Sequence, residues 1–307
     1  MTFRVLASDP LAATAVASMR EAGLEVDEKT DLTPEQLLEE IGGYDAIVIR
    51  SATKVSASII DAGTNLKLVV RAGVGLDNVD VAYAEEKGIA VRNTPAASSN
   101  SVAELALGHM LSLARNIGRG TVSMKARKWE KKALKGIEID GKTLGIVGIG
   151  RIGCSLARKA KGLGMRVIAH DAFLAACPVE GLAEMVDMDR LLAESDFVSL
   201  HIPFDAAVGA TVGAAELAKM KDGVRIVNCA RGGVVDEDAL VAAMESGKVA
   251  GAALDVFTSE PTTGAEPIVA MDNVSLTPHI GAATVEAQVR VGAEAAQIVI
   301  DFAKSAG

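Results

Sequence analysis

One segment, residues 143–172 (TLGIVGIGRIGCSLARKAKGLGMRVIAHDA), constrains the fold of this chain more than any other part of the sequence. An apolar run leads into a glycine-rich turn, a stretch with helical spacing follows, and a second apolar run ends at Asp171. This order predicts a strand, a helix and a second strand, with Gly148, Gly150 and Gly153 at the first turn. Because a strand–helix–strand unit joins parallel strands, we expect a parallel sheet here.

The three glycines meet the requirements of a phosphate-binding loop. Gly148 permits the tight turn, Gly150 lets the backbone approach a pyrophosphate, and Gly153 lets helix and strand pack closely. The N–H groups and the dipole at the helix N-terminus then hold the anion. Asp171 follows Gly153 by eighteen residues (171 − 153), where its carboxylate can bind both ribose hydroxyls of an adenosine and repel a 2′-phosphate. Because Ala172 supplies no compensating arginine, the segment predicts NAD rather than NADP; the alternative is a glycine-rich turn with a surface aspartate.

Strand-like and helix-like stretches alternate along the whole chain. β-Branched runs lie in FRVLAS, DAIVIR, LKLVVRA and GIAVRN near the N-terminus, separated by helical spacing at 11–22 and 56–62. A second series predicts strands at 143–148, 165–170, 196–200, 224–228 and 250–254, and a closing helix over 284–303. In a chain of 307 residues, this pattern indicates two α/β domains built on mostly parallel sheets.

The two series are joined by the polar stretch NTPAASSNS near residue 93, which we interpret as a connector between domains. It leads to Ser101 and Glu104, spaced as in a capping box, so we expect a helix from Ser101 to about Arg115. The next stretch, KARKWEKKALKG, carries six basic residues against one glutamate, with Trp129 in its middle. It is either a solvated charged segment or an arm whose Trp129 packs on a partner subunit, with nucleic acid as a third interpretation.

Composition argues against several other classes of protein. The formal net charge of −9, the pI near 5.1 and the 3% aromatic content disfavour a nucleic-acid-binding surface. No stretch approaches the roughly 18 apolar residues of a membrane span, and the first apolar run meets Asp9 and Pro10 too early for a secretory signal. Three cysteines, an odd number without CxxC spacing, suit a reducing cytoplasm and predict neither disulfides nor a metal site.

A nicotinamide cofactor requires a protein group that exchanges a proton while hydride moves, and histidine is the usual choice. Of the four histidines, His109 falls inside the expected helix 101–115 and is assigned to a core or an interface. His170 lies next to the ribose aspartate and is expected to point elsewhere. His201 ends a strand near the expected adenosine edge of the cofactor, where positioning is favoured over proton transfer. His279, in LTPHIGAAT, follows a strand and a proline and precedes a glycine turn, so it is the one placed to face a cleft.

Two further charged residues follow strand ends, where ligands bind in open α/β sheets. Glu260, in LDVFTSEP, is the candidate to hold His279 in one tautomer and to favour the imidazolium. Arg231, in GVRIVNCARGG, lies just past the apolar run 224–227 and before two glycines. An ion pair or a helix cap would explain Arg231. Alternatively, its guanidinium can bind the carboxylate of a 2-hydroxy or 2-oxo acid bidentately and polarise the carbonyl.

Arg231, Glu260 and His279, together with the Gly148 loop, resemble the D-isomer-specific 2-hydroxyacid dehydrogenases. The resemblance extends over nearly the whole chain, through RSATKVSASIID, RAGVGLDNVD, NTPAASSNSVAEL, KWEKKALKG, GIGRIG, NCARGGVVDE, GAALDVFTSEP and PHIGAAT. Within that family, these motifs are most similar to the enzymes that oxidise 3-phospho-D-glycerate. The resemblance implies that Arg231 orients the substrate, that His279 performs the acid–base step, and that Glu260 supports His279.

The resemblance also implies which residues contact NAD. Arg151 and Ile152 of the glycine loop would meet the pyrophosphate, and Asp171 the ribose. Asp255 would lie near the carboxamide. The other positions implied around the two ends of the cofactor are Pro203, Cys229, Ala230 and Gly281. Val74, also placed at the cofactor, stands where family members often have threonine.

The family fold implies two doubly wound parallel-sheet domains of the α/β class. A Rossmann NAD-binding domain would span 96–283, and a smaller flavodoxin-like substrate domain would combine 1–95 with 284–307. The helix-rich region around Trp129 would form a homodimer interface, with a tetramer as the alternative. Because the sequence ends at Gly307, we expect a short form without the C-terminal regulatory domains that longer relatives append.

Arg50, Lys54 and Arg71 follow strand ends of the first domain and could bind the phosphate and carboxylate of a phosphorylated acid; ordinary surface charge is the alternative. The expected substrate site also includes Ser51, Gly73 and Gly75. The implied activity is the reversible NAD-dependent oxidation of 3-phospho-D-glycerate to 3-phosphohydroxypyruvate, the entry to serine synthesis. The alternatives are a glyoxylate/hydroxypyruvate reductase or a D-lactate dehydrogenase and, in a different class, an NADH-sensing corepressor.

Overall fold

The computed structural model describes residues 2–306. Its contacts divide the chain into two compact units, residues 1–98 with 282–307 and residues 99–281. The boundaries expected from the sequence, 95/96 and 283/284, lie within three residues of these. Each unit has its own parallel sheet and its own hydrophobic core, which is the defining property of a domain.

The first unit is built on a five-stranded parallel sheet in the order β2-β1-β3-β4-β5, the order of flavodoxin-like sheets. Its strands are β1 (Arg4–Ala7), β2 (Glu25–Glu28), β3 (Ala46–Ile49), β4 (Leu68–Arg71) and β5 (Ala90–Asn93). The sequence predicted all of these except β2. That strand, EVDE, contains no apolar run because it lies at the edge of the sheet, where it pairs with β1 alone.

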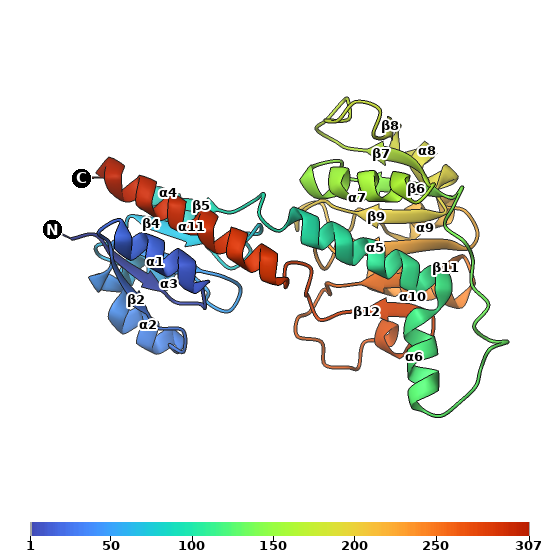
Figure 1. The fold of residues 1–307 in the computed structure, drawn as a ribbon, viewed down its shortest axis with the longest axis horizontal. Coiled ribbons are helices and arrows are strands. Elements are labelled where there is room, and N and C mark those ends of the chain that lie inside the picture. Colours follow the sequence, from blue (N-terminus) through green and yellow to red (C-terminus); the bar gives the residue numbers. More distant parts are fainter. Residues whose placement is uncertain (1, 307) are drawn as a thin grey trace. The chain divides into compact units, whose positions relative to one another are not determined.

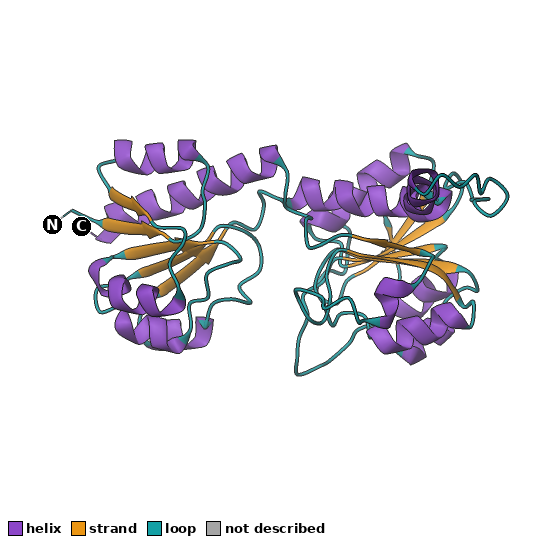
Figure 2. Ribbon diagram, turned by 90° about the horizontal axis from the view of Figure 1, so that it is seen from below, coloured by secondary structure: helices purple, strands orange, loops and turns teal. Residues whose placement is uncertain are grey.

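Helices cover both faces of this first sheet, as Figures 1 and 2 show. α1 (Ala13–Glu21) and α11 (Val285–Ala306) pack side by side on one face, and their apolar residues form one core cluster with β1 and β4. The other face is covered by α2 (Pro34–Glu40), η1 (Ile41–Gly43), α3 (Ala57–Ala62) and α4 (Val81–Glu86). The last helix of the chain therefore completes the unit that the first residues begin.

The second unit is built on a seven-stranded parallel sheet in the order β12-β11-β10-β9-β6-β7-β8. Its strands are β6 (Thr143–Val147), β7 (Arg166–His170), β8 (Glu184–Met185), β9 (Phe197–Leu200), β10 (Val224–Asn228), β11 (Val249–Leu254) and β12 (Val274–Leu276). The strand order reverses between β6 and β9, and ligands of doubly wound sheets bind at such a switch point. The two sheets confirm the predicted fold class of two parallel-sheet α/β domains.

Helices also cover both faces of the second sheet (Figure 2). α5 (Ser99–Arg115) and α7 (Arg151–Gly162) pack together on one face. The other face is covered by α8 (Met188–Glu194), α9 (Ala214–Lys219) and α10 (Glu237–Glu245), with η2 (Pro267–Ala270) before β12. Because β6 is covered on both sides, all five of its residues are buried. No helix among residues 2–306 is both long and apolar enough to cross a membrane.

The helix that opens the second unit begins earlier than expected. α5 starts at Ser99, so the prediction that Ser101 and Glu104 form its capping box was wrong. Ser101 is buried inside the first turn, whereas Glu104 accepts a 2.7 Å hydrogen bond from Asn100 Nδ2 and lies 3.8 Å from Lys159 Nζ. Because the serines before it can start a helix as well as Ser101 can, the spacing alone did not determine the first residue.

The segment after α5 forms a surface of the second unit. It consists of α6 (Ile117–Lys125) and the irregular residues 126–142, and we call it the α6 surface. Its exposed apolar side chains are Ile117 (54% exposed), Val122 (68%), Met124 (57%) and Trp129 (80%). One exposed apolar side chain is ordinary, but Ile117, Met124 and Trp129 line one open hollow and so form a patch of the kind that another molecule covers.

Candidate active site

The three charged residues expected to act together follow three neighbouring strands of the second unit. Arg231 follows β10, Glu260 follows β11 and His279 follows β12, and these strands are adjacent and parallel. Because parallel strands end at the same edge of a sheet, all three loops lie at the carboxyl edge. Two of the loops also touch, since a Cβ on Gly232 would collide with the carbonyl oxygen of Phe257. The Arg231 loop therefore packs backbone to backbone on the loop that leads to Glu260.

His279 and Glu260 form a hydrogen-bonded pair. The His279 Nδ1 lies 2.6 Å from the Glu260 Oε2. The other carboxylate oxygen, Oε1, accepts a 2.9 Å hydrogen bond from the Phe257 N–H, which fixes the orientation of the carboxylate. Because a carboxylate accepts, Nδ1 carries the proton, and Nε2 of the neutral ring is available as a base. The two side chains are 48% and 35% exposed, so a ligand can reach the pair.

The backbone at His279 adopts an unusual conformation. Its φ is 53°, in the left-handed region that residues with a Cβ seldom occupy, and such strain typically costs about 1–3 kcal/mol. Asp255, which is 1% exposed, holds this loop in place. Its carboxylate accepts 2.8 Å hydrogen bonds from the N–H groups of Ile280 and Gly281, and its main-chain carbonyl accepts one from the His279 N–H. These contacts stabilise the strained backbone and so determine where the imidazole points.

The turn that carries Arg231 is held by the buried side chain of Asn228. The Asn228 Nδ2 donates to the Arg231 carbonyl (2.8 Å), and its Oδ1 accepts from the Ala230 N–H (3.0 Å). The Arg231 Nη1 donates to the Ala230 carbonyl at 2.7 Å. Between them, Cys229 is buried, and burial, reinforced by the Asp255 charge, raises the pKa of its thiol. This side chain therefore stays neutral and adds no competing charge beside the guanidinium.

The glycine turn has the shape that a dinucleotide pyrophosphate requires. Gly148 has φ +92°, and a Cβ there would lie 2.5 Å from the His201 carbonyl oxygen. A Cβ on Gly153 would collide with the Gly148 carbonyl, so helix and strand meet at this residue. In contrast, a Cβ on Gly150, the N-cap of α7, would have no heavy atom within 4 Å. The open space lies directly before the unpaired N–H groups of the first helical turn, so the turn fits NAD.

Two residues of that first turn, Arg151 and Ile152, present their backbone N–H groups at the N-terminus of α7. Asp171 lies at the carboxyl end of the neighbouring strand β7. One of its oxygens accepts a 3.0 Å hydrogen bond from the Ile149 N–H, and the other accepts from the N–H groups of Phe173 (2.9 Å) and Leu174 (3.2 Å). The aspartate therefore orders the glycine turn itself, and its contact with ribose hydroxyls stays a prediction.

The other three histidines of the second unit are engaged elsewhere. The His201 Nε2 lies 3.0 Å from the Ser199 Oγ, and its buried Nδ1 has no hydrogen-bond partner among residues 2–306. Burial lowers the pKa of His201 to about 4, which keeps the ring neutral. The His170 Nδ1 lies 3.2 Å from the Val186 carbonyl oxygen. His109 is buried in α5.

The basic turn expected to bind substrate lies in the first unit, after β3. Asp9, which is 2% exposed, accepts hydrogen bonds from the N–H groups of Arg50 and Thr53 and from the Thr53 hydroxyl (3.0 Å). From the other side, the Asn78 Nδ2 donates to the carbonyls of Arg50 (2.7 Å) and Thr53 (2.6 Å). The backbone from Arg50 to Thr53 is therefore held on both sides, while the following Lys54 is exposed.

The neighbouring loop follows β4 and contains the other expected residues of the first unit. Arg71 packs over Gly73, where a Cβ would collide with the guanidinium, and Gly73 has φ +152°. The carbonyl of Val74 accepts a hydrogen bond from Asn93 Nδ2. Gly75 belongs to the same turn. Two further positions expected at the site are exposed: Ser51, which follows Arg50, and Pro203, which follows β9. The three catalytic candidates all lie in the second unit.

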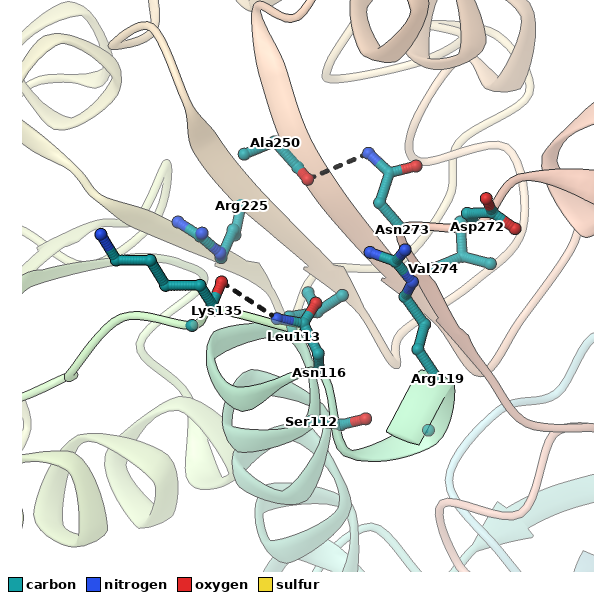
Figure 3. Close-up of a pocket in the computed structure, with 12 residues that line it drawn as sticks. Ser112, Leu113, Asn116, Arg119, Lys135, Arg225, Ala250, Asp272, Asn273 and Val274 are labelled. Atoms are coloured by element: carbon teal, nitrogen blue, oxygen red, sulfur yellow. Dashed lines mark hydrogen bonds between the residues drawn. The ribbon is translucent and has the colours of Figure 1, made fainter. Parts of the chain in front are cut away.

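Two cavities of the second unit mark opposite edges of its sheet. A cavity of about 500 Å³ lies beside the His279–Glu260 pair and has mostly apolar walls, including Phe257, Val269 and Leu276. Figure 3 shows a smaller cavity of about 210 Å³, lined by Arg119, Lys135, Arg225, Ala250 and Asn273 among others. Because Arg225 and Ala250 lie near the amino ends of β10 and β11, this second cavity is remote from His279.

Sequence reasoning missed the residues that hold these loops. Asp9, Asn78, Asn228 and the loop-binding function of Asp255 were not foreseen, and the contact of Asp255 with a carboxamide stays a prediction. Three of the four are polar residues at or just after the ends of apolar strands, and they are themselves buried. A single carboxylate or amide at the end of an apolar strand could have indicated a residue that holds a neighbouring loop, because a buried polar group requires a hydrogen-bond partner nearby.

Comparison with known proteins assigns the chain to a class. Residues 107–281 match the family model described as D-isomer specific 2-hydroxyacid dehydrogenase, NAD binding domain. The chain is 52% identical over 296 residues to a hydroxypyruvate reductase from Thermotoga maritima, covering 95% of each. It is 45% identical over 302 residues to a D-3-phosphoglycerate dehydrogenase from Archaeoglobus fulgidus, covering 98% of this chain and 57% of that relative. A D-lactate dehydrogenase structure from Aquifex aeolicus, complexed with NAD and lactic acid, is 29% identical, with a TM-score of 0.83 and coverage of 98% and 96%.

The chain therefore belongs to the D-isomer-specific 2-hydroxyacid dehydrogenase family. The predicted enzyme class, an NAD-dependent oxidoreductase, and the predicted cofactor are confirmed. The resemblance to the phosphoglycerate dehydrogenases is also confirmed in sequence, although the chain spans little more than half the length of those relatives.

Proposed function

We propose that the protein catalyses the reversible NAD-dependent oxidation of 3-phospho-D-glycerate to 3-phosphohydroxypyruvate, the first step of serine biosynthesis. The observation that carries this proposal is the basic turn after β3, whose backbone is held by Asp9 and Asn78. Arg50 and Lys54 flank this rigid turn. Because a phosphate adds roughly two negative charges to a hydroxy acid, such a turn favours the phosphorylated substrate. The 45% identity to a D-3-phosphoglycerate dehydrogenase supports the same assignment.

The chemical step uses the three loops at the carboxyl edge of the second sheet. Arg231 binds the substrate carboxylate and the C2 oxygen, which aligns the reacting carbon and stabilises charge on that oxygen. The Nε2 of His279 accepts the C2 hydroxyl proton while the C2–H bond breaks and the C2–O bond becomes a carbonyl. NAD held at the Gly148 turn would supply the acceptor for the C2 hydride. Glu260 then stabilises the imidazolium through its bond to Nδ1, and the reverse reaction returns the proton by the same route.

Paired substrates test the proposed phosphate site directly. NADH formation is measured with 3-phospho-D-glycerate and with D-glycerate, which differ only in the phosphate. We expect Arg50→Ala and Lys54→Ala each to raise KM for 3-phospho-D-glycerate at least about tenfold and to change KM for D-glycerate less than about twofold. Lys87→Ala, which removes a lysine paired with Asp61, is the matched control and should change neither. Equal effects of the turn variants on both substrates would refute the phosphate site.

A second function, reduction of hydroxypyruvate, is favoured by the 52% identity to a hydroxypyruvate reductase over 95% of both chains. The same active site would then run mainly in the reductive direction on an unphosphorylated acid. The ratio of kcat/KM for 3-phosphohydroxypyruvate to that for hydroxypyruvate, both with NADH, separates the two functions. A ratio above about ten supports the phosphorylated substrate, and one below about a tenth supports the reductase.

We also propose that a second copy of this chain covers the α6 surface and so forms a homodimer. A two-fold dimer brings the same patch of both copies together, so the exposed apolar side chains of this surface, among them Trp129, would cover one another. Sedimentation velocity should give a dimer for the wild type and a monomer for a Val122→Asp/Trp129→Ser double variant. A monomeric wild type at micromolar concentration would contradict this part of the proposal.

A further inference from the structure

His109 joins α5 to the strand that leads to His279. Its side chain is buried, at 3% exposed, in the middle of the helix. The Nδ1 lies 2.8 Å from the Ser275 Oγ and the Nε2 lies 3.0 Å from the Thr277 Oγ1. Ser275 belongs to β12 and Thr277 follows it, so both ring nitrogens contact the segment directly before His279. Such complete engagement of a buried ring indicates a more specific function than filling the core.

The hydrogen bonds beyond Thr277 determine the direction of the whole chain of contacts. The Thr277 hydroxyl lies 2.6 Å from the Asp255 Oδ1, and that carboxylate also accepts from the N–H groups of Ile280 and Gly281. A hydroxyl has a single hydrogen, and the Thr277 hydroxyl donates it in the hydrogen bond to the Asp255 carboxylate. The Thr277 Oγ1 must therefore accept from the Nε2–H of His109. It follows that the Nδ1 of His109 accepts from Ser275 and that one tautomer of the ring is specified.

We propose that His109 is a positioning residue for the reaction, which acts through Thr277 and Asp255 to hold the loop that carries His279. The inference rests on the proposed acid–base function of His279. The connection runs from the His109 Nε2–H to the Thr277 hydroxyl, to the Asp255 carboxylate, and to the backbone N–H groups beyond His279. Burial lowers the pKa of His109, against an opposing effect of the Asp255 charge, and so favours the neutral ring that this arrangement uses.

The loop depends on these contacts because its backbone is strained. His279 has φ 53°, a conformation that persists only where the surroundings impose it. Without the donor on His109, the Thr277 hydroxyl is free to rotate and Asp255 loses a fixed partner. A displacement of about 1 Å at a reacting group can cost on the order of 100-fold in rate, so even partial relaxation of the loop should reduce kcat.

Substitution of His109 separates positioning from simple structural support. We expect His109→Leu to lower kcat about tenfold at saturating substrate while KM for NAD stays within about twofold. His109→Gln, whose amide can still donate to Thr277, should recover at least threefold of that loss. Met110→Ala is the matched control, because Met110 is a fully buried neighbour on α5 and its truncation should lower Tm but leave kcat within twofold. A His109→Leu variant that loses Tm but keeps kcat would overturn the proposal.

A double-mutant cycle tests the route through Thr277. Thr277→Val removes the hydroxyl with little change in volume, and we expect it to lower kcat about as much as His109→Leu does. If both residues act through one chain, the double variant should be no slower than the slower single variant by more than about twofold. Multiplicative losses would show independent effects and would contradict the proposed route.

Nitrogen-15 NMR of the histidine-labelled wild type supplies a readout that does not depend on turnover. The proposal requires His109 to be protonated at Nε2 and unprotonated at Nδ1 at pH 7, and the opposite tautomer would overturn it. The kinetic variants are assayed with whichever hydroxy acid the wild type oxidises fastest. Failure of 3-phospho-D-glycerate as substrate would therefore defeat the proposed substrate while leaving the test of His109 intact.

Discussion

The imidazole of His279 and the carboxylate of Glu260 are joined by a 2.6 Å hydrogen bond between loops that follow different strands. The bond uses Nδ1, so Nε2, the proposed base, lies on the opposite side of the ring. Because the Phe257 N–H holds the Glu260 carboxylate, the position of the backbone at Phe257 helps to fix the orientation of the His279 ring. The acid–base function proposed for His279 thus depends on loop geometry as much as on the residue types.

Removing the charge of Glu260 should impair catalysis while preserving the fold. Glu260→Gln retains an oxygen for the Phe257 N–H but no longer stabilises an imidazolium, so we expect kcat to fall about 100-fold. KM for NAD should change less than about twofold, since Glu260 follows β11 and the glycine turn follows β6. Steady-state kinetics check both values, and a kcat within threefold of wild type would remove Glu260 from the mechanism.

Shortening the guanidinium fork should reveal how Arg231 binds substrate. Arg231→Lys keeps the positive charge but cannot make two parallel hydrogen bonds to a carboxylate, so kcat/KM for the hydroxy acid should fall about 100-fold. NADH affinity, measured by fluorescence titration, should stay within threefold. If lysine restores most of the activity, the residue acts only as a point charge.

Two glycines of the cofactor turn should respond in opposite ways to the same substitution. Gly148→Ala places a Cβ at positive φ against the His201 carbonyl and should destabilise the fold by about 1–3 kcal/mol. Gly150→Ala meets no protein atom and should leave stability within about 0.5 kcal/mol. It should instead weaken NADH binding at least about tenfold, because the methyl group occupies the space before the helix N-terminus. Urea denaturation and NADH titration measure the two effects, and a stable Gly150→Ala variant with normal NADH affinity would contradict the assigned pyrophosphate site.

Acid should destabilise the protein partly through His201. Burial lowers the pKa of this ring from 6.5 to about 4, so between those values the unfolded chain binds a proton that the folded chain does not. Stability attributable to His201 is therefore lost as the pH falls from about 6.5 towards 4. At pH 5 the loss relative to pH 7 should be about 2 kcal/mol, and it should be absent in His201→Gln. Urea denaturation of both proteins at the two pH values checks this, and an equal acid response would contradict it.

Much of the fold could be predicted from local pattern alone. The buried strands of both sheets are short apolar runs, and the glycine turn predicts the strand before it and the helix after it. β2 was missed because a polar edge strand looks like a loop, and the start of α5 was misplaced because consecutive serines can all begin a helix. These are positions where several local solutions have similar energies and tertiary packing selects one.

The candidate site could be predicted only in part. Arg231, Glu260 and His279 were identifiable because each follows a strand, and their catalytic roles stay predictions. The hydrogen bonds of His109 to Ser275 and Thr277 span more than 160 residues of sequence, and no spacing rule reveals such pairs. Likewise, the sequence shows Asp255 as one acid among many, and only its burial beside three donors distinguishes it.

The packing of α11 against α1 has a consequence for how the polypeptide matures. One face of the first sheet is covered by α1 alone until residues 285–306 have left the ribosome, whereas residues 99–281 are contiguous and can complete their own core earlier. The portion translated second is therefore able to reach its native state first. During synthesis, apolar side chains of β1 and β4 on this face therefore stay partly exposed until α11 packs, and exposed apolar surface of this kind favours aggregation.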